Sequence, residues 1–295
     1  MGKRFDIIGD IHGMLLSFRA ALGEIGYTQR SGTWFHPEGR ILVSVGDLID
    51  RGSDPLGCLE LMKKIIEDGC GYMVLGNHEI DALQYTTRHS RTKEWLREHS
   101  EGKKSQFSET QRQIDSDPAR WEILKAFLKI QPTYLELDDG KLRVVHACWG
   151  YKFLDVRDLP VHIDSQEILE RTADKKGRDP MWRAVECCIK GPEQDAGTPF
   201  KDKDGIQRYN ERVPWWETYP AKAPFVTFGH YWFGPKGLTS RDRPVLKEPT
   251  ILSPGKNTTC LDFSLGNGGS VVVLRWPEKE LQEYQYCENA ALAPR

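Results

Sequence analysis

The sequence predicts an α/β fold in which short parallel β-strands alternate with helices. Apolar runs at residues 5–8, 41–45 and 72–75 have the length of buried strands, and apolar residues recur at helical spacing between them. Strands joined through helices of this length pair in parallel with right-handed crossovers. Because such sheets bind their ligands at the carboxyl ends of the strands, we expect the functional residues directly after each apolar run.

Each helix of this first unit has its own signal. The first helix is predicted from the apolar residues that line one of its faces. The second helix also has a start signal, because Asp54 followed by Pro55 is a favourable N-cap and first-turn pair. The face-lining residues are Leu15, Phe18, Leu22 and Ile25 in the first helix, and Leu59, Met62 and Ile66 in the second.

The remainder of the chain reads as two insertions and a return to strands. Residues from about 85 to 131 look polar and helical, with a late helix beginning at Asp117–Pro118, whereas about 151–223 look irregular and rich in Pro, Gly and charge. Further strands are predicted at 141–150, 224–230, 258–264 and 269–276. We therefore expect a single domain over residues 1–295 with insertions at about 85–131 and 151–223.

Composition excludes several classes of protein. The 295 residues are 39% hydrophobic with a net charge of -2 and a pI of about 6.5, so we expect neither membrane association nor stable DNA binding. No apolar run is long enough to span a bilayer, and the N-terminus lacks the apolar stretch of a secretory signal. The 7 cysteines include no CxxC pair, which favours a reducing, cytoplasmic setting.

Charged and polar side chains follow five of the predicted strands. The first three strands run into "GDIHG" (9–13), "GDLIDRG" (46–52) and "GNHE" (76–79), and two later strands end at a histidine. Glycine permits the tight exit from strand to loop, and residues two apart in extended backbone face the same side. The side chains delivered to one sheet edge are Asp10, His12, Asp47, Asn77, His146 and His230.

This set of ligands predicts a pair of metal ions. Oxygen and imidazole ligands without thiolate suit Mn, Fe or Zn, and six ligands are too many for one catalytic ion that keeps an open position. Two ions that share a carboxylate would use all six, and Asp47 is the natural shared ligand. Asp50 can then orient His78 as a general acid, while Arg51 can bind two phosphate oxygens.

GDxHG, GDxxDRG and GNHE in this order, followed by two isolated histidines, resemble the phosphoprotein-phosphatase (calcineurin-like) family of binuclear metallophosphoesterases. The resemblance covers about residues 5–85, 142–150 and 225–233, and implies a four-layer α-β-β-α sandwich of two mixed sheets. It also implies a second phosphate-binding arginine, for which Arg183 in "DPMWRAVE" is the candidate and Arg208 and Arg212 are rivals. The implied ligands are Asp10, His12, Asp47 and His230 on one ion, and Asp47, Asn77 and His146 on the other.

The resemblance further implies a metal-dependent phosphatase that hydrolyses phosphomonoesters, as on Ser/Thr phosphoproteins, by attack of a hydroxide bridging two divalent ions. Mn²⁺ is the expected ion, with Fe, Zn, Ni and Mg as alternatives. The expected partner is a phosphorylated substrate, which is a phosphoprotein, a nucleotide or an RNA end. Symmetrical dinucleoside polyphosphate hydrolysis and RNA-end dephosphorylation remain alternative activities. A non-catalytic binding module is a weaker alternative, because all the predicted ligands and the acid are present.

Overall fold

The structure is a computed structural model. It describes residues 3–30, 32–152, 154–174, 179–201, 207–233, 249–252 and 255–285, without the side chains of residues 101–106.

The first sheet contains the three parallel strands that the sequence predicts. Strands β1 (Phe5–Ile8), β4 (Ile41–Ser44) and β5 (Gly71–Met73) pair in parallel, with Ile7 opposite Val43. On the other side of β1 the pairing is antiparallel, so the sheet is mixed. The strands on that side are β15 (Ser270–Trp276), β14 (Asp262–Phe263) and β16 (Glu280–Gln285).

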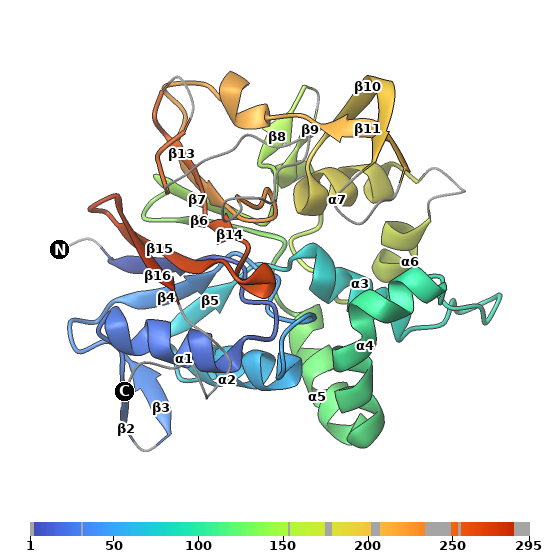
Figure 1. Cartoon of the computed structure of the whole chain (residues 1–295), viewed down its shortest axis with the longest axis horizontal. Coiled ribbons are helices and arrows are strands. Elements are labelled where there is room, and N and C mark those ends of the chain that lie inside the picture. Colours follow the sequence, from blue (N-terminus) through green and yellow to red (C-terminus); the bar gives the residue numbers. More distant parts are fainter. Residues whose placement is uncertain are drawn as a thin grey trace.

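The second sheet is also mixed and lies against the first (Figure 1). Strand β12 (Phe225–Phe228) pairs in parallel with both β7 (Leu142–Val145) and β13 (Thr258–Cys260), and β6 (Tyr134–Leu137) is antiparallel to β7. The two stacked sheets confirm the predicted sandwich, because their central strands, such as β1, β4, β12 and β15, bury most of their side chains in the core.

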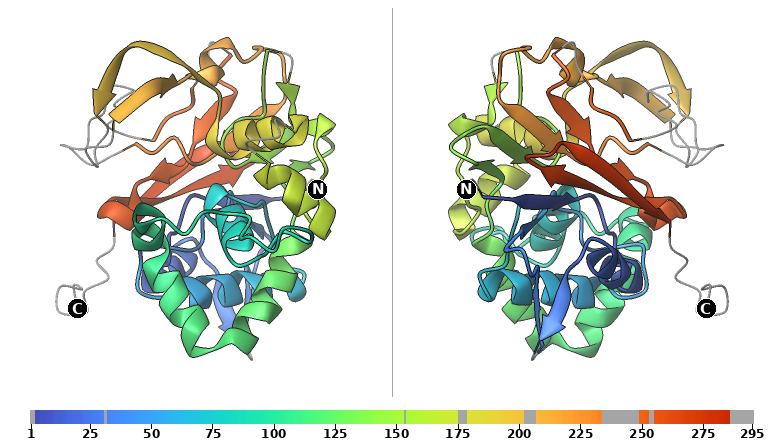
Figure 2. Two further views of the ribbon diagram at one scale, coloured as in Figure 1. Left: turned by 90° about the vertical axis from the view of Figure 1, so that its right-hand side faces the viewer. Right: turned by 90° about the vertical axis from the view of Figure 1, so that its left-hand side faces the viewer.

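Helices α1 (Leu15–Glu24) and α2 (Pro55–Glu67) cover the outer face of the first sheet (Figure 2). Asp54 caps α2 as predicted, since its side chain accepts a hydrogen bond from the Gly57 backbone N at 2.9 Å. A short hairpin, β2 (Thr28–Arg30) and β3 (Thr33–Phe35), follows α1 and was absent from the sequence prediction. Its strands are exposed or half-buried, so they lack the apolar pattern that would reveal them.

On the far side, the second sheet is covered less regularly. The 3₁₀-helix η2 (Trp215–Thr218) buries both of its tryptophans, and their rings pack on Phe228 of β12. The Trp215 indole N–H donates to the Ala147 carbonyl at 2.9 Å, which ties η2 to the end of β7.

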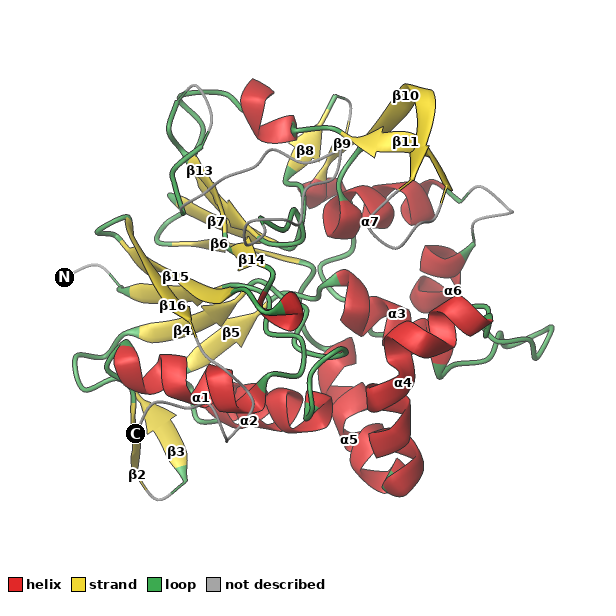
Figure 3. Cartoon of the chain, in the orientation of Figure 1, coloured by secondary structure: helices red, strands yellow, loops and turns green. Residues whose placement is uncertain are grey.

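The first insertion contains a non-helical segment followed by two helices. Helix α3 (Asn77–Tyr85) leads into a non-helical segment, residues 86–100, and then into α4 (Glu101–Ser116) and α5 (Pro118–Lys129). These helices gather beyond the carboxyl ends of β4 and β5 (Figure 3). Among the described residues, every helix is too short or too polar to cross a lipid bilayer.

The segment 151–223 is more regular than the sequence suggested. Helix α7 (Pro180–Lys190) has Asp179 as its cap, so the Asp–Pro signal that marks α2 and α5 is also present here, and the sequence analysis did not use it. The hairpin of β10 (Glu193–Lys201) and β11 (Gln207–Arg212) was not predicted, because its residues are mostly polar and exposed. The other elements of this segment are β8 (Gly150–Tyr151), β9 (Leu154–Asp155), η1 (Val156–Asp158) and α6 (Gln166–Ala173). Outside it, a short 3₁₀-helix, η3, covers Leu265–Asn267.

Candidate metal centre

The six side chains expected at the strand ends are all buried in one region. Each lies at or just beyond the carboxyl end of β1, β4, β5, β7 or β12. Their exposed fractions are 3% for Asp10, 1% for His12, 2% for Asp47, 8% for Asn77, 0% for His146 and 8% for His230.

Asp47 stands at the centre of this cluster. Its Oδ2 lies 3.3 Å from His146 Nε2, 3.8 Å from His78 Nε2 and 3.9 Å from His12 Nε2. Two sets of ligand atoms close enough to hold an ion therefore share this one carboxylate. The first set is Asp47 with His12 and His78, and the second is Asp47 with His146 and His230.

The grouping of His230 differs from the expected division of ligands. The sequence reading placed His230 on one ion with Asp10 and His12, whereas its ring lies 5.3 Å from the ring of His146 and joins the second set. The His230 backbone N donates to Asp10 Oδ2 at 3.2 Å, so it is the main chain of His230 that contacts Asp10. Asn77 Oδ1 lies 3.2 Å from His146 Nε2, on the same side as the second set.

Unusual backbone conformation accompanies the cluster. Five residues of the strand-end loops have positive φ although they are not glycine, and such conformations persist only where the surrounding structure enforces them. They are His12 (51°), Asp47 (53°), Asp50 (69°), Arg51 (68°) and His230 (62°).

Glu79 enforces part of this geometry, and the sequence reading did not assign it a role. The fully buried carboxylate accepts hydrogen bonds from the backbone N of Asp47 at 2.8 Å, of Leu48 at 2.7 Å and of Gly76 at 2.9 Å. It therefore joins the loop after β4 to the start of α3. The available signal was its place in GNHE, three residues after the residue that precedes the helix.

Burial and neighbouring charge shift the pKa values of the cluster in opposite directions. Burial, with the carboxylates of Asp262 and Asp47, raises the pKa of Asp10 well above its usual range. Burial would also raise the pKa of Asp47, but the imidazoles of His146 and His78 outweigh it and hold that pKa well below the usual range. Burial, with Arg51 and His78, lowers the pKa of His12 well below its ordinary value.

The residues fit divalent cations. Asp10 Oδ1 is buried and has no hydrogen-bond partner among the described residues, although a buried carboxylate oxygen is normally satisfied. Gly229 leaves space at this oxygen, since a Cβ there would lie 2.0 Å from it. Carboxylate, amide and imidazole donors suit Mn, Fe or Zn, and a cation would relieve the repulsion between Asp10 and Asp47.

His78 lies beside the cluster and is paired to Asp50. Its Nδ1 is 2.5 Å from Asp50 Oδ2, and its ring meets the ring of His12 edge to face at 4.8 Å. Burial lowers the pKa of His78, but the charge of Asp47 and the hydrogen bond to Asp50 raise it to about 9. Asp47 and Asp50 thus favour the protonated form of this imidazole.

The candidate phosphate-binding arginines differ in their exposure and in their contacts. Arg51 is exposed, and its positive charge acts to lower the pKa of both Asp10 and His12. Arg212, at the end of β11, donates from Nη1 to the His230 carbonyl at 3.3 Å. Arg183 is exposed on α7, and Arg208 is exposed on β11.

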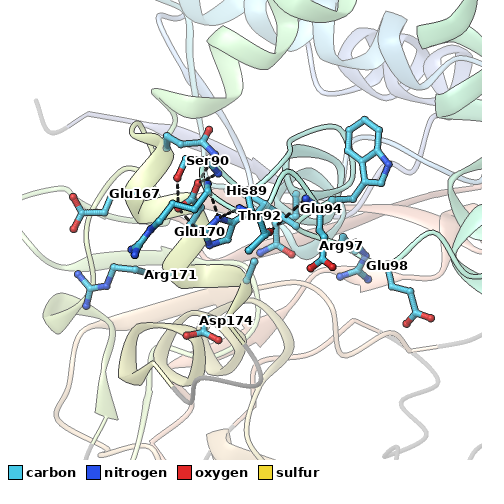
Figure 4. Close-up of a pocket in the computed structure, with 16 residues that line it drawn as sticks. His89, Ser90, Thr92, Glu94, Arg97, Glu98, Glu167, Glu170, Arg171 and Asp174 are labelled. Atoms are coloured by element: carbon cyan, nitrogen blue, oxygen red, sulfur yellow. Dashed lines mark hydrogen bonds and ion pairs between the residues drawn. The ribbon is translucent and has the colours of Figure 1, made fainter.

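A large cavity opens near the other end of α3 (Figure 4). It has a volume of about 1170 Å³ and lies between the segment 89–98 and α6, with Gln84 of α3 in its lining. Since Gln84 follows Asn77 by seven residues of helix, this wall is about 10 Å from the cluster along α3. The lining carries five carboxylates and three arginines.

Known proteins resemble the chain over nearly its whole length. Residues 3–241 match the family described as calcineurin-like phosphoesterases. The bis(5'-nucleosyl)-tetraphosphatase PrpE [asymmetrical] of Halalkalibacterium halodurans is 31% identical over 281 residues, which cover 94% of this chain and 92% of that protein. Its counterpart in a Geobacillus species is 27% identical with the same coverage. The solved cold-active protein-tyrosine phosphatase of a Shewanella species has a similar fold, with a TM-score of 0.51, 16% identity, and coverage of 97% of this chain and 81% of that one.

Proposed function

Since the chain belongs to the family of calcineurin-like phosphoesterases, and is therefore a metal-dependent hydrolase of phosphoesters, we propose that it cleaves the phosphate chain of dinucleoside polyphosphates. The observation that carries the hydrolytic part is the central position of Asp47, whose Oδ2 lies 3.3 Å from His146 Nε2 and 3.9 Å from His12 Nε2, between the ligands proposed for the two ions. The substrate part is supported by full-length relatives named asymmetrical bis(5'-nucleosyl)-tetraphosphatases.

This proposal changes the order of the substrates considered from the sequence. There, a Ser/Thr phosphoprotein-like phosphomonoester came first and a symmetrical dinucleoside polyphosphate was an alternative. The relatives favour the alternative class and, by their name, unequal cleavage. Unequal cleavage of a dinucleoside tetraphosphate yields a nucleoside triphosphate and a monophosphate, whereas symmetrical cleavage yields two diphosphates.

The proposed ligands divide between two ions. Asp10, His12 and Asp47 would hold one ion, and Asp47, Asn77, His146 and His230 the other, with Mn²⁺ the ion we expect. Divalent ions at such a site lower the pKa of water and offset negative charge on a phosphoryl group.

The chain's own side chains supply the remaining chemistry. As the bond between phosphorus and the leaving oxygen breaks, His78 gives its Nε2 proton to that oxygen, and Asp50 holds the ring through Nδ1. Arg51, exposed beside the cluster, pairs with phosphoryl oxygens through its planar guanidinium. Arg212 is the candidate that we prefer for the second arginine, because it already contacts the His230 carbonyl.

The cavity beside α3 suits one end of such a substrate. Its carboxylates outnumber its arginines, which disfavours a phosphate chain but leaves hydrogen-bonding groups for a nucleoside. One wall, residues 89–98, belongs to the polar helical insertion, and the opposite wall is α6 with the residues that follow it.

A product analysis tests the proposal. The protein loaded with Mn²⁺ is incubated separately with diadenosine tetraphosphate, a phosphopeptide, an RNA with a terminal phosphate and p-nitrophenyl phosphate, and the products are separated by anion exchange. We expect ATP and AMP from the first substrate and at least tenfold lower kcat/KM for the phosphopeptide and RNA. Two ADP molecules would overturn the unequal cleavage, and preference for the peptide or RNA would overturn the substrate class. Asp47→Asn is the inactive control.

A further inference from the structure

Helix α4 presents two buried polar side chains to the loop that carries Asp50. Thr110 is 0% exposed and Gln113 is 8% exposed, and they lie on the same face as the apolar residues Phe107 and Ile114. Residues three or four apart share one face of a helix, so this face was positioned to pack against a neighbour. Hydroxyl and amide groups on such a face need partners, and both find them in residues 50–56.

Thr110 completes the environment of the Asp50 carboxylate. The Thr110 hydroxyl donates to Asp50 Oδ1, while Oδ2 of the same carboxylate faces His78 Nδ1 at 2.5 Å. One oxygen is therefore fixed by α4 and the other is directed at the imidazole. Without the hydroxyl, the Asp50 carboxylate would lose the partner that fixes its rotation. The His78 ring, which is held through the other oxygen of that carboxylate, would then lose its fixed orientation.

Gln113 holds the same loop one helical turn further along. Its Oε1 accepts from the Leu56 backbone N at 3.1 Å, and its Nε2 donates to the Ser53 carbonyl at 3.1 Å. The loop needs such support, because Asp50 and Arg51 both have positive φ.

We propose that Thr110 is a positioning residue, which holds the Asp50 carboxylate so that His78 directs its proton at the leaving oxygen. The polar helical insertion then takes part in the reaction through α4. This inference rests on the proposed role of His78 as the acid. Thr110 itself need not touch the substrate.

The test compares leaving groups. Phenyl phosphate releases a phenolate about as basic as that of tyrosine, with a pKa near 10, and so depends on protonation. The p-nitrophenolate ion is far less basic and departs with little help. We expect Thr110→Val to lower kcat for phenyl phosphate roughly tenfold more than for p-nitrophenyl phosphate, at unchanged metal content, because loss of a residue that orients a reacting side chain costs about 10–100-fold. Thr110→Ser keeps the hydroxyl and should restore most of the selective loss.

A matched control is available in the second sheet. Thr258 on β13 is also 0% exposed, and its hydroxyl has no hydrogen-bond partner among the described residues. Thr258→Val makes the same chemical change away from Asp50 and should leave both rates unchanged. If valine prevents folding at position 110, Thr110→Ala supplies the same comparison with a smaller side chain.

The outcomes separate this inference from the function on which it rests. Equal losses on both substrates in Thr110→Val, or no loss, would overturn the positioning role. His78→Asn is measured in parallel. If it discriminates between the substrates and Thr110→Val does not, the acid role stands and the inference about Thr110 falls. If His78→Asn does not discriminate, the acid role itself falls.

Discussion

Arg40 is expected to be the most costly exchange of a charged residue outside the metal cluster. Its side chain is 2% exposed, and its Nε donates to Asp6 Oδ1 at 2.8 Å. Its Nη2 also donates to the carbonyls of Phe5 at 2.9 Å and Trp276 at 3.2 Å, which are the first residue of β1 and the last residue of the neighbouring strand β15. Glu278 accepts from the same guanidinium at the surface.

The size of the effect follows from what Arg40→Met would leave behind. Asp6 is fully buried and would lose its principal partner, and breaking a buried ion pair costs about 3–5 kcal/mol. Arg275 Nε remains 3.3 Å from Asp6 Oδ1, so we expect the lower end, about 3 kcal/mol. For a protein of 295 residues the midpoint Tm should fall by about 5 °C. Adding Asp6→Asn removes the stranded charge and should recover about 1–2 kcal/mol.

Thermal unfolding followed by circular dichroism in the presence of a chelator measures these changes. Arg4→Met is the matched control, because Arg4 pairs with Glu38 at 2.9 Å while the two side chains are 42% and 62% exposed. Such a surface pair is worth less than about 1 kcal/mol. Equal losses for Arg40→Met and Arg4→Met, or further destabilisation when Asp6→Asn is added to Arg40→Met, would refute the reasoning.

Three further predictions concern the metal cluster and one helix. Asp47→Asn should abolish both hydrolysis and the rise in Tm on adding Mn²⁺, because both candidate ligand sets use this carboxylate, and a surviving rise would contradict its shared role. Gly229→Ala should weaken Mn²⁺ binding at least tenfold in calorimetric titration, since its Cβ would lie 2.0 Å from Asp10 Oδ1; unchanged affinity would argue against Asp10 as a ligand. Gly23→Ala in α1 should instead raise the free energy of unfolding by roughly 0.5–1 kcal/mol in urea, because the added Cβ meets no atom within 4 Å.

The sequence predicted the parts of the site that local patterns encode. Apolar runs located the strands, and the Gly–Asp and Gly–Asn pairs after them located the buried polar side chains that we propose as ligands, because a strand must end before its polar residues can gather at a sheet edge. The parallel order of β1, β4 and β5 then followed from the helices between them. The buried positions of Asp10, Asp47 and Asn77 agree with this reasoning.

Other features depend on backbone geometry that residue spacing does not reveal. His230 joins His146 because its main chain has a φ of 62° and its backbone N is directed at Asp10. The role of Thr110 is equally hidden, since it lies 60 residues from Asp50 and no local motif relates a helix in an insertion to that loop. Glu79 and the Asp179–Pro180 start of α7 differ, because their local signals were present in the sequence.

The proposed metal ligands and the two insertions occupy different parts of the fold, so they can change independently. The proposed ligands come from buried strand ends, so replacing one of them also disturbs the core. In contrast, α4 contacts Asp50 beside the cluster through Thr110, and β11 contacts the His230 carbonyl through Arg212. The cavity walls at 89–98 and α6 are one step further removed. Substrate preference can therefore vary in the outer segments while the metal ligands stay fixed, which explains why the ligand motifs predict the reaction class better than the substrate.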